Sequence, residues 1–263
     1  MSDLNITIVQ SDLHWEDIPA NIEHLALLLE DVDPYTDLII LPEVFNTGFP
    51  VDPVKFAENE SGPTIQWMKE MATRHDCVIT GSMLFNESGK FYNRLIWMQP
   101  DGTYDHYSKR HVFTLGEEAD IIQPGQENKI FKLKDWKIKP QVCYDLRFPV
   151  WAKNTYSDDG FEYDLLFYVA NWPAVRSFVW RHLLVARALE NQSYVVGVNR
   201  IGRDGLGHDY SGDSCLVNAK GQIVSDFKEN AEQLKSYRIS LDEMNAFRNK
   251  FNVGLDWDKF SVE

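Results

Sequence analysis

Cys143 is the residue at which the sequence first suggests chemistry. It ends a short apolar strand predicted over residues 138–142, and a polar turn through Tyr144 and Asp145 follows at once. A thiol at the end of a rigid strand is held in place yet stays reachable, which suits a nucleophile. The backbone N–H of Tyr144 would point into the same space as an oxyanion donor. The alternative is a buried structural cysteine, because free thiols are among the most buried side chains.

A cysteine nucleophile needs a base, because the pKa of a free thiol is about 8.5 and little thiolate exists at neutral pH. Histidine is the usual partner, and His111 and His182 are the most plausible candidates. Neither stands at the end of a predicted strand. Glu43 does, just after the strand predicted over residues 37–41. A partly buried carboxylate has a raised pKa and can accept a thiol proton, so these residues leave both a histidine base and a glutamate base open.

Two further charged residues fit the same chemistry. Lys109 follows a strand predicted over residues 103–108, and its ammonium would favour first the thiolate and then the developing oxyanion. Glu118 lies just beyond it and would orient the lysine or help to move protons. Taken singly, Lys109 in Lys-Arg-His is typical of a surface charge, and Glu43 after Leu-Pro is typical of a solvated loop. The prediction therefore depends on these side chains meeting in the fold.

Strands and helices alternate along the chain, and some strands form antiparallel hairpins, which predicts an α/β fold with mixed sheets covered by helices. The strands at 37–41 and 164–170 are wholly apolar, as in strands buried on both faces. Apolar residues at helical spacing predict helices over 64–75 and 178–191. Strand ends on one edge of such sheets are where sites are usually assembled. Three strands stop at such polar residues: Glu43, Cys143 and Asn171.

The remaining segments give weaker signals. Asn21 is predicted to cap the first helix, and the Gly- and Asp-rich residues 202–212 are predicted to form a loop. Residues 213–217 and 222–227 are predicted to form a last hairpin. The tail after Leu241 is only weakly patterned. The sequence contains no repeat, linker or low-complexity segment, so one domain over residues 1–263 is predicted.

Composition excludes several classes of protein. The 26 Lys plus Arg residues face 40 Asp plus Glu, giving a formal net charge of −14, which argues against nucleic acid or an anionic membrane as the main partner. Three scattered cysteines indicate neither a disulfide framework nor a four-cysteine zinc site, and they fit a reducing compartment. We find no signal peptide and no membrane-spanning run, so a cytoplasmic location is predicted. No nucleotide-binding glycine motif or His-rich metal spacing occurs, so no cofactor and no metal are predicted.

Three motifs occur in one order along the chain: Leu41-Pro-Glu43, Tyr107-Ser-Lys-Arg-His111 and Cys143-Tyr-Asp-Leu-Arg-Phe148. In order and spacing they resemble the motifs of the nitrilase, or carbon–nitrogen hydrolase, superfamily, and the resemblance extends from Ile6 to about Phe227. The helix Leu184–Gln192 matches the Arg-Ala-x-Glu-Asn signature of the family. Cys143-Tyr-Asp-Leu-Arg-Phe-Pro149 and Ala170-Asn-Trp-Pro173 look most like the ω-amidase branch, including its bacterial members.

The resemblance implies a four-layer α-β-β-α sandwich that dimerises into an eight-layer assembly, with the tail from about residue 241 as a possible oligomer-contact arm. It implies that Glu43 is the general base, Lys109 the oxyanion-stabilising cation and Cys143 the nucleophile of an amide hydrolysis that passes through a thioester. Glu118 would be the second glutamate, with the adjacent Glu117 as the alternative.

An ω-amidase reading implies a small dicarboxylate monoamide as substrate, such as 2-oxoglutaramate or 2-oxosuccinamate. Its free carboxylate needs a cation, best a bidentate arginine. Arg147, Arg176 and Arg181 are the candidates, and Arg176 is preferred. Arg187 is predicted to be structural instead, paired with the neighbouring Glu190. Three aromatic residues would wall the pocket, although each is equally consistent with core packing: Phe45, Tyr144 and Trp172.

Other interpretations remain open. A nitrilase, an N-carbamoyl amidase or an aliphatic amidase would use the same catalytic residues. A non-catalytic binding protein on the same fold is a further alternative, although the presence of Glu43, Lys109 and Cys143 together argues against it. A Cys–His hydrolase with His111 or His182 as base is the third.

Overall fold

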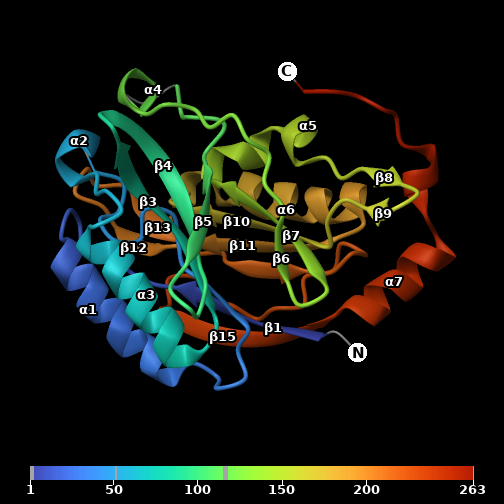
Figure 1. The fold of residues 1–263 in the computed structure, drawn as a ribbon, viewed down its shortest axis with the longest axis horizontal. Coiled ribbons are helices and arrows are strands. Elements are labelled where there is room, and N and C mark those ends of the chain that lie inside the picture. Colours follow the sequence, from blue (N-terminus) through green and yellow to red (C-terminus); the bar gives the residue numbers. More distant parts are fainter. Residues whose placement is uncertain (1–2, 51, 115–117, 263) are drawn as a thin grey trace.

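The computed structural model describes residues 3–50, 52–114 and 118–262. Two β-sheets form its centre, and helices cover their outer faces (Figure 1). The first sheet has the strand order β15-β1-β2-β3-β4-β5. Its strands are β1 (Asp3–Gln10), β2 (Leu38–Ile40), β3 (Val78–Glu87), β4 (Lys90–Met98), β5 (Tyr104–Ser108) and β15 (Gln233–Ser240). The second sheet has the order β14-β11-β10-β7-β6. Its strands are β6 (Phe131–Leu133), β7 (Trp136–Val142), β10 (Leu165–Ala170), β11 (Tyr194–Asn199) and β14 (Cys215–Val217).

The wholly apolar strands are buried on both faces. In β10, alternate residues starting at Leu165 enter the core between the two sheets, and those starting at Leu166 pack beneath a helix. Side chains of a strand alternate between its faces, so each face is buried by a different layer. In β2, Leu38 faces the other sheet, whereas Ile39 faces the helices on the outside.

The helices supply the two outer layers. Helices α1 (Ile18–Leu28) and α3 (Pro63–His75) lie side by side over the first sheet, and α6 (Ser177–Asn191) covers the second (Figure 1). The predicted α-β-β-α sandwich is therefore confirmed. The shorter helices are α2 (Pro53–Phe56), α4 (Glu118–Ile121), α5 (Pro149–Ala152) and α7 (Leu241–Lys250). The 3-10 helices are η1 (Leu29–Asp31), η2 (Cys143–Arg147), η3 (Ala174–Arg176) and η4 (Val253–Asp256). None of the helices in the described ranges is long and apolar enough to cross a membrane.

Two local predictions were wrong. Residues 222–227 form no second hairpin strand; only an isolated bridge joins Ile223 to Val217. The edge of the first sheet is closed instead by β15, which pairs antiparallel with β1 over its whole length. The segment 202–212 is not plain loop, because a hairpin forms there from β12 (Ile201–Arg203) and β13 (Asp209–Ser211). A second small hairpin joins β8 (Tyr156–Ser157) to β9 (Gly160–Phe161).

The cap of α1 also differs from the prediction. Asp17 accepts the Ala20 N–H at 3.0 Å and so begins the helix. Asn21 is fully buried in the first turn, where its amide donates to the carbonyl groups of His14 and Asn46. Asn21 therefore ties two loops to the helix, a role for which the sequence gives no signal.

Helix α7 folds back on this chain. Met244 enters the core between the sheets, and the buried Arg248 guanidinium lies 2.6 Å from Asp164. Residues 241–250 are therefore not a free arm. The oligomer contact predicted for the tail from about residue 241 remains a prediction.

Candidate active site

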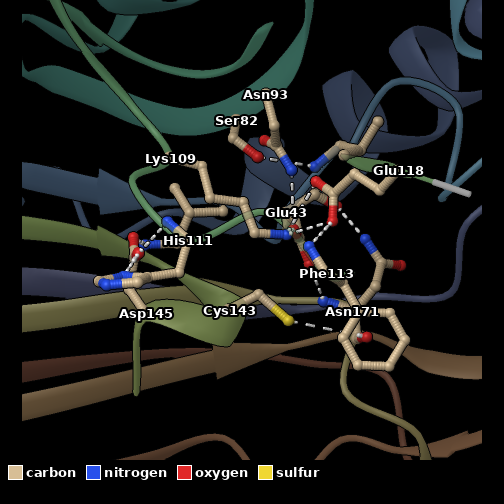
Figure 2. Close-up of polar contacts among 12 residues, drawn as sticks. Glu43, Ser82, Asn93, Lys109, His111, Phe113, Glu118, Cys143, Asp145 and Asn171 are labelled. Carbon is tan, nitrogen blue, oxygen red and sulfur yellow. Dashed lines mark hydrogen bonds and ion pairs between the residues drawn. The ribbon is translucent and has the colours of Figure 1, made fainter. Parts of the chain in front are cut away.

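The three predicted catalytic side chains lie together at one end of the two sheets. Glu43 follows β2, Lys109 follows β5, and Cys143 follows β7. Figure 2 shows the Lys109 ammonium reaching two carboxylates, Glu43 at 3.1 Å and Glu118 at 3.0 Å, with Cys143 beside them. Glu117 lies outside the described residues. The three predicted strand ends therefore converge on one cavity, and Glu118, the first residue of α4, lies beside them. Their catalytic roles remain a prediction.

The Glu43 carboxylate is held from several sides. It is only 1 % exposed, and its Oε1 accepts from Asn93 at 2.8 Å as well as from Lys109. Its Oε2 accepts the Asn171 N–H at 2.7 Å. The Asn171 side chain in turn donates to the Glu43 carbonyl. A buried carboxylate that receives this many donors keeps one geometry. No motif or spacing in the sequence points to Asn93 as one of these donors.

Lys109 is a buried cation between two buried anions. Burial alone would lower its pKa, but the charges of Glu118 and Glu43 outweigh burial and raise the pKa well above the ordinary value. Burial raises the pKa of Glu118, and the Lys109 charge offsets this only in part. Glu118 also accepts the Phe113 N–H at 2.7 Å. Lys109 is therefore a fixed positive charge held between two buried carboxylates.

Cys143 has a strained backbone. Its φ angle is 44°, a left-handed conformation that non-glycine residues adopt uncommonly and that is found at functional sites. The thiol lies near the Asn171 carbonyl, with 4.0 Å between Sγ and O. Burial raises the pKa of Cys143 well above its ordinary range, and the Glu43 charge raises it further, whereas Lys109 lowers it. The resting thiol is therefore protonated, and attack requires a base next to it.

Asp145 ties the turn that carries Cys143 to the loop that carries Lys109. Its carboxylate is fully buried. One oxygen accepts the Tyr107 hydroxyl at 2.8 Å and the Val142 N–H at 3.0 Å, and the other accepts the His111 N–H at 2.9 Å. His111 Nδ1 lies 2.8 Å from the same carboxylate (Figure 2). His111 is thus bound to Asp145 and does not line the cavity that contains Cys143.

The same cavity argues against the other histidine proposed as base. His182 lies on α6, where its Nδ1 contacts the Phe178 carbonyl at 2.6 Å, and it does not line the cavity. Glu43, in contrast, lines the cavity together with Cys143. The geometry thus favours the glutamate over either histidine as the base.

The cavity has a volume of about 820 Å³ and is bounded largely by apolar side chains. Eight of its lining residues are Phe49, Pro50, Pro53, Phe113, Ile121, Trp172, Pro173 and Leu206. Tyr144 also lines it, as predicted, and packs edge-on against Phe113 with ring centroids 5.1 Å apart. Phe45 does not line it. This side chain is fully buried against Trp67 and close to Gly81, so its predicted contact with substrate is wrong.

Two of the predicted arginines reach the cavity. Both Arg147 and Arg176 are exposed there, and neither forms an ion pair with any carboxylate in the described ranges. Trp172 holds both in place. Its ring lies 5.0 Å from the Arg147 guanidinium, and its indole N–H donates to the Arg176 carbonyl at 2.9 Å. Arg181 is bound to Asp213 instead and does not line the cavity.

Arg187 has the structural role that its spacing predicts. It pairs with Glu190 at 2.9 Å and donates to the Leu146 carbonyl at 2.6 Å. It thereby fastens α6 to the turn that carries Cys143. Four residues of the cavity that the sequence did not predict lie on the β12–β13 hairpin: Asp204, Leu206, His208 and Tyr210.

Comparison with known proteins agrees with this site. A sequence model of the carbon–nitrogen hydrolase family matches residues 5–249. The chain belongs to this family. An ω-amidase named YafV from Yersinia enterocolitica is 42 % identical over 260 residues, covering 99 % of each chain. The 2-oxoglutaramate amidase of Bacillus subtilis is 28 % identical over 224 residues, covering 84 % of this chain and 85 % of its own.

Solved structures of the family also match. A carbon–nitrogen hydrolase superfamily protein from Xanthomonas campestris superposes with a TM-score of 0.97 at 39 % identity, covering 100 % of both chains. The carbon–nitrogen hydrolase of Helicobacter pylori has a TM-score of 0.84 at 18 % identity over 97 % of this chain and 94 % of its own, a likeness of fold alone. The chain is therefore an amide-hydrolysing enzyme of the ω-amidase branch.

Proposed function

We propose that this enzyme removes the terminal amide of a small dicarboxylate monoamide, such as 2-oxoglutaramate or 2-oxosuccinamate, through a thioester on Cys143. The observation that carries the proposal is the pair of guanidinium groups, Arg147 and Arg176, in the cavity of Cys143. The cavity is wider than a five-carbon amide requires. Recognition of so small a molecule then depends on its charged end more than on the shape of the apolar walls.

Glu43 takes the thiol proton as Cys143 Sγ attacks the amide carbonyl carbon. The carbonyl oxygen becomes an oxyanion stabilised by the Lys109 ammonium and the Tyr144 N–H. When the tetrahedral intermediate collapses, the C–N bond breaks, and Glu43 returns the proton to the leaving nitrogen as ammonia forms. Water, deprotonated by Glu43, then attacks the thioester carbonyl. The C–S bond breaks, Glu43 returns the proton to the Cys143 thiolate, and the acid is released. Glu118 positions Lys109.

The test is ammonia release from 2-oxoglutaramate, measured beside glutamine, a simple nitrile and an N-carbamoyl amino acid, with Cys143→Ala as blank. We expect 2-oxoglutaramate to be turned over with the highest kcat/KM. Preference for another compound of the panel would contradict the proposed substrate. Turnover that persists in Cys143→Ala would contradict Cys143 as the nucleophile.

Removing either free arginine should weaken binding of the substrate carboxylate. We expect Arg176→Leu and Arg147→Leu each to lower kcat/KM for 2-oxoglutaramate by about 10–100-fold, since hydrogen bonds to charged groups contribute about 1.5–3 kcal/mol. The loss should be in KM rather than kcat, because the carboxylate is bound equally in ground and transition states. Arg203→Ala, at an exposed arginine outside the cavity, is the control. A fall in kcat with KM unchanged would count against a binding role.

The homodimer implied by the family and the cytoplasmic location indicated by the cysteine content remain predictions.

A further inference from the structure

The β12–β13 hairpin forms one wall of the cavity. Asp204, Leu206, His208 and Tyr210 line it together with Cys143. The hairpin begins just after β11 ends, and β13 packs against η3, the turn that ends at Arg176. The hairpin thus stands beside the arginine that we assign to the charged end of the substrate.

Asp204 organises this wall. Its Oδ1 accepts the N–H groups of Leu206 and His208, both at 2.9 Å. Its Oδ2 accepts the Tyr210 hydroxyl at 2.9 Å and lies 3.0 Å from His208 Nδ1. Burial would raise the pKa of Asp204, but these hydrogen bonds lower it, so the carboxylate stays ionised. With its oxygens occupied inside the hairpin, Asp204 orients His208 and Tyr210 and does not itself bind the substrate.

Buried residues pack against the wall on the side away from the cavity. The Tyr210 ring lies 4.8 Å from the guanidinium of Arg200, which is fully buried and pairs with Asp12 at 3.1 Å. The Cβ of any residue replacing Gly202 would clash with the Asp12 carboxylate, and Gly202 has a φ of 87°. The base of the hairpin is therefore fixed by close packing, and the position of His208 relative to Cys143 is set by the fold.

His208 is the polar group that this wall presents. Its side chain is 58 % exposed and lines the cavity, while Nδ1 faces Asp204. When Nδ1–H donates to Asp204, the second ring nitrogen, Nε2, is left for a ligand. An imidazolium donates from both nitrogens, and Asp204 supplies the opposite charge on the far side of the ring. Such an arrangement suits an anionic partner in the cavity.

We propose that His208 is a specificity-determining residue that donates from Nε2 to the free carboxylate of the substrate, beside Arg176. The inference rests on the proposed function, in which the substrate carries that carboxylate. It explains why a cavity with largely apolar walls contains an imidazole oriented by a buried carboxylate. It also assigns a role to a hairpin that is far from Cys143 in sequence.

The experiment compares two amides that differ only at the far end: glutaramate, which ends in a carboxylate, and pentanamide, which ends in a methyl group. kcat/KM is measured for the wild type, His208→Leu and the control Arg203→Ala, which removes an exposed charge from the same hairpin. We expect His208→Leu to lower kcat/KM for glutaramate by about 10–100-fold and to leave pentanamide within about threefold. Arg203→Ala should leave both unchanged. Because His208 is exposed, the melting temperature of His208→Leu should match the wild type.

Two results with the variant would overturn the inference: an equal loss on both amides, which would make His208 a structural residue, or no loss on glutaramate. Failure of the proposed function would be detected separately, from the kcat/KM values of the wild-type enzyme alone. If the wild-type enzyme does not prefer glutaramate to pentanamide, the carboxylate-bearing substrate is wrong, and the role of His208 falls with it.

Discussion

We expect ammonia release to fall by a factor on the order of 10⁶ in Cys143→Ala, the scale of loss when a hydrolase loses its nucleophile, and by about 10²–10⁴ in Glu43→Gln. The second value follows from the protonation state of the site. Burial and the Glu43 charge both raise the pKa of Cys143, so the thiolate forms only when its proton has an acceptor. Glutamine fills the same space but cannot accept that proton.

Lys109 requires a different design, because removing it leaves two buried carboxylates without their cation. Truncating one partner of a buried ion pair costs about 3–5 kcal/mol of stability, so Lys109→Met alone tests folding as much as catalysis. The double variant Lys109→Met, Glu118→Gln removes one charge of each sign and leaves the net charge of the cluster unchanged. We expect this variant to fold and still to lose at least about 10²–10³ in kcat, the usual effect of losing one oxyanion donor.

The measurements are kcat, KM and the melting temperature for each variant. His182→Ala is the control, because its side chain is exposed on α6 and does not line the cavity; its kinetics should match the wild type. His111→Ala should keep measurable turnover, since His111 acts only through Asp145. If His111→Ala loses as much turnover as Glu43→Gln while its melting temperature is unchanged, a Cys–His mechanism is favoured. Glu43 would then not be the base.

The convergence of the catalytic side chains could be predicted from the sequence because each follows a strand. The apolar runs at β2 and β10 predict strands that are buried on both faces, whereas β7 alternates apolar and polar residues. The ends of such strands lie at common edges. Glu43 and Cys143 are polar residues at such ends, so chemistry and position point the same way. The order of the three motifs indicated the family. The resemblance to that family then supported the role of Lys109 as the oxyanion-stabilising cation.

The rest of the site depends on contacts between residues distant in sequence. Phe45 and Phe49 belong to the same loop, yet the first is buried in the core and the second lines the cavity. Aromatic character does not distinguish these two fates. His208 sits in a segment rich in glycine and aspartate, which is typical of a loop. Only the hydrogen bonds of Asp204 reveal that this loop is an ordered wall.

The edge strand β15 was missed for a similar reason. Its residues from Gln233 to Ser240 alternate imperfectly and include Lys235 and Arg238, which weakens the apolar pattern. Charged residues are common on edge strands, where they discourage pairing with other chains. The strand forms because β1 offers an unpaired edge along its whole length, and that edge is a property of the sheet rather than of the local sequence.

Lys139 is the position at which we expect a substitution to raise stability most. It lies on β7, fully buried, and its Nζ has no hydrogen-bond partner in the described ranges. Its Nζ lies 5.3 Å from the centroid of the Tyr163 ring, a cation–π contact. Burial lowers the pKa of Lys139 to about 8, and the distant charge of Glu162 opposes this only weakly. Unlike Lys109, this cation is not next to two carboxylates, so burying its charge lowers the free energy of unfolding.

The sign of the pH dependence follows from the lowered pKa. In the unfolded chain Lys139 titrates near its ordinary pKa of about 10.4, so between about pH 8 and 10.4 the unfolded state binds more protons than the folded state. Its contribution to the free energy of unfolding therefore rises with pH across that window. Below pH 8 the full cost is present. At 1.36 kcal/mol for each pKa unit, that cost is on the order of 3 kcal/mol.

Lys139→Met should therefore raise the free energy of unfolding at pH 7 by up to about 3 kcal/mol, because methionine fills the space without a charge. Urea denaturation at pH 7, 8, 9 and 10 measures this, and the quantity of interest is the variant minus the wild type. That difference isolates Lys139, since burial raises the pKa of Cys77 and of Cys215 to about 12, and these thiols lower the stability of both proteins as pH rises. The difference should shrink steadily toward pH 10.

Lys132→Met is the matched control, because Lys132 lies on the adjacent strand β6 and its side chain is exposed. Surface substitutions usually change stability by less than about 0.5 kcal/mol, so this variant should show neither the gain nor the pH trend. If Lys139→Met is no more stable than the wild type at pH 7, the ammonium is solvated or paired inside the protein. The unsatisfied atoms of Gln141 and Tyr168, whose residues pair across β7 and β10, would then be the place to look for buried water, which commonly satisfies such groups.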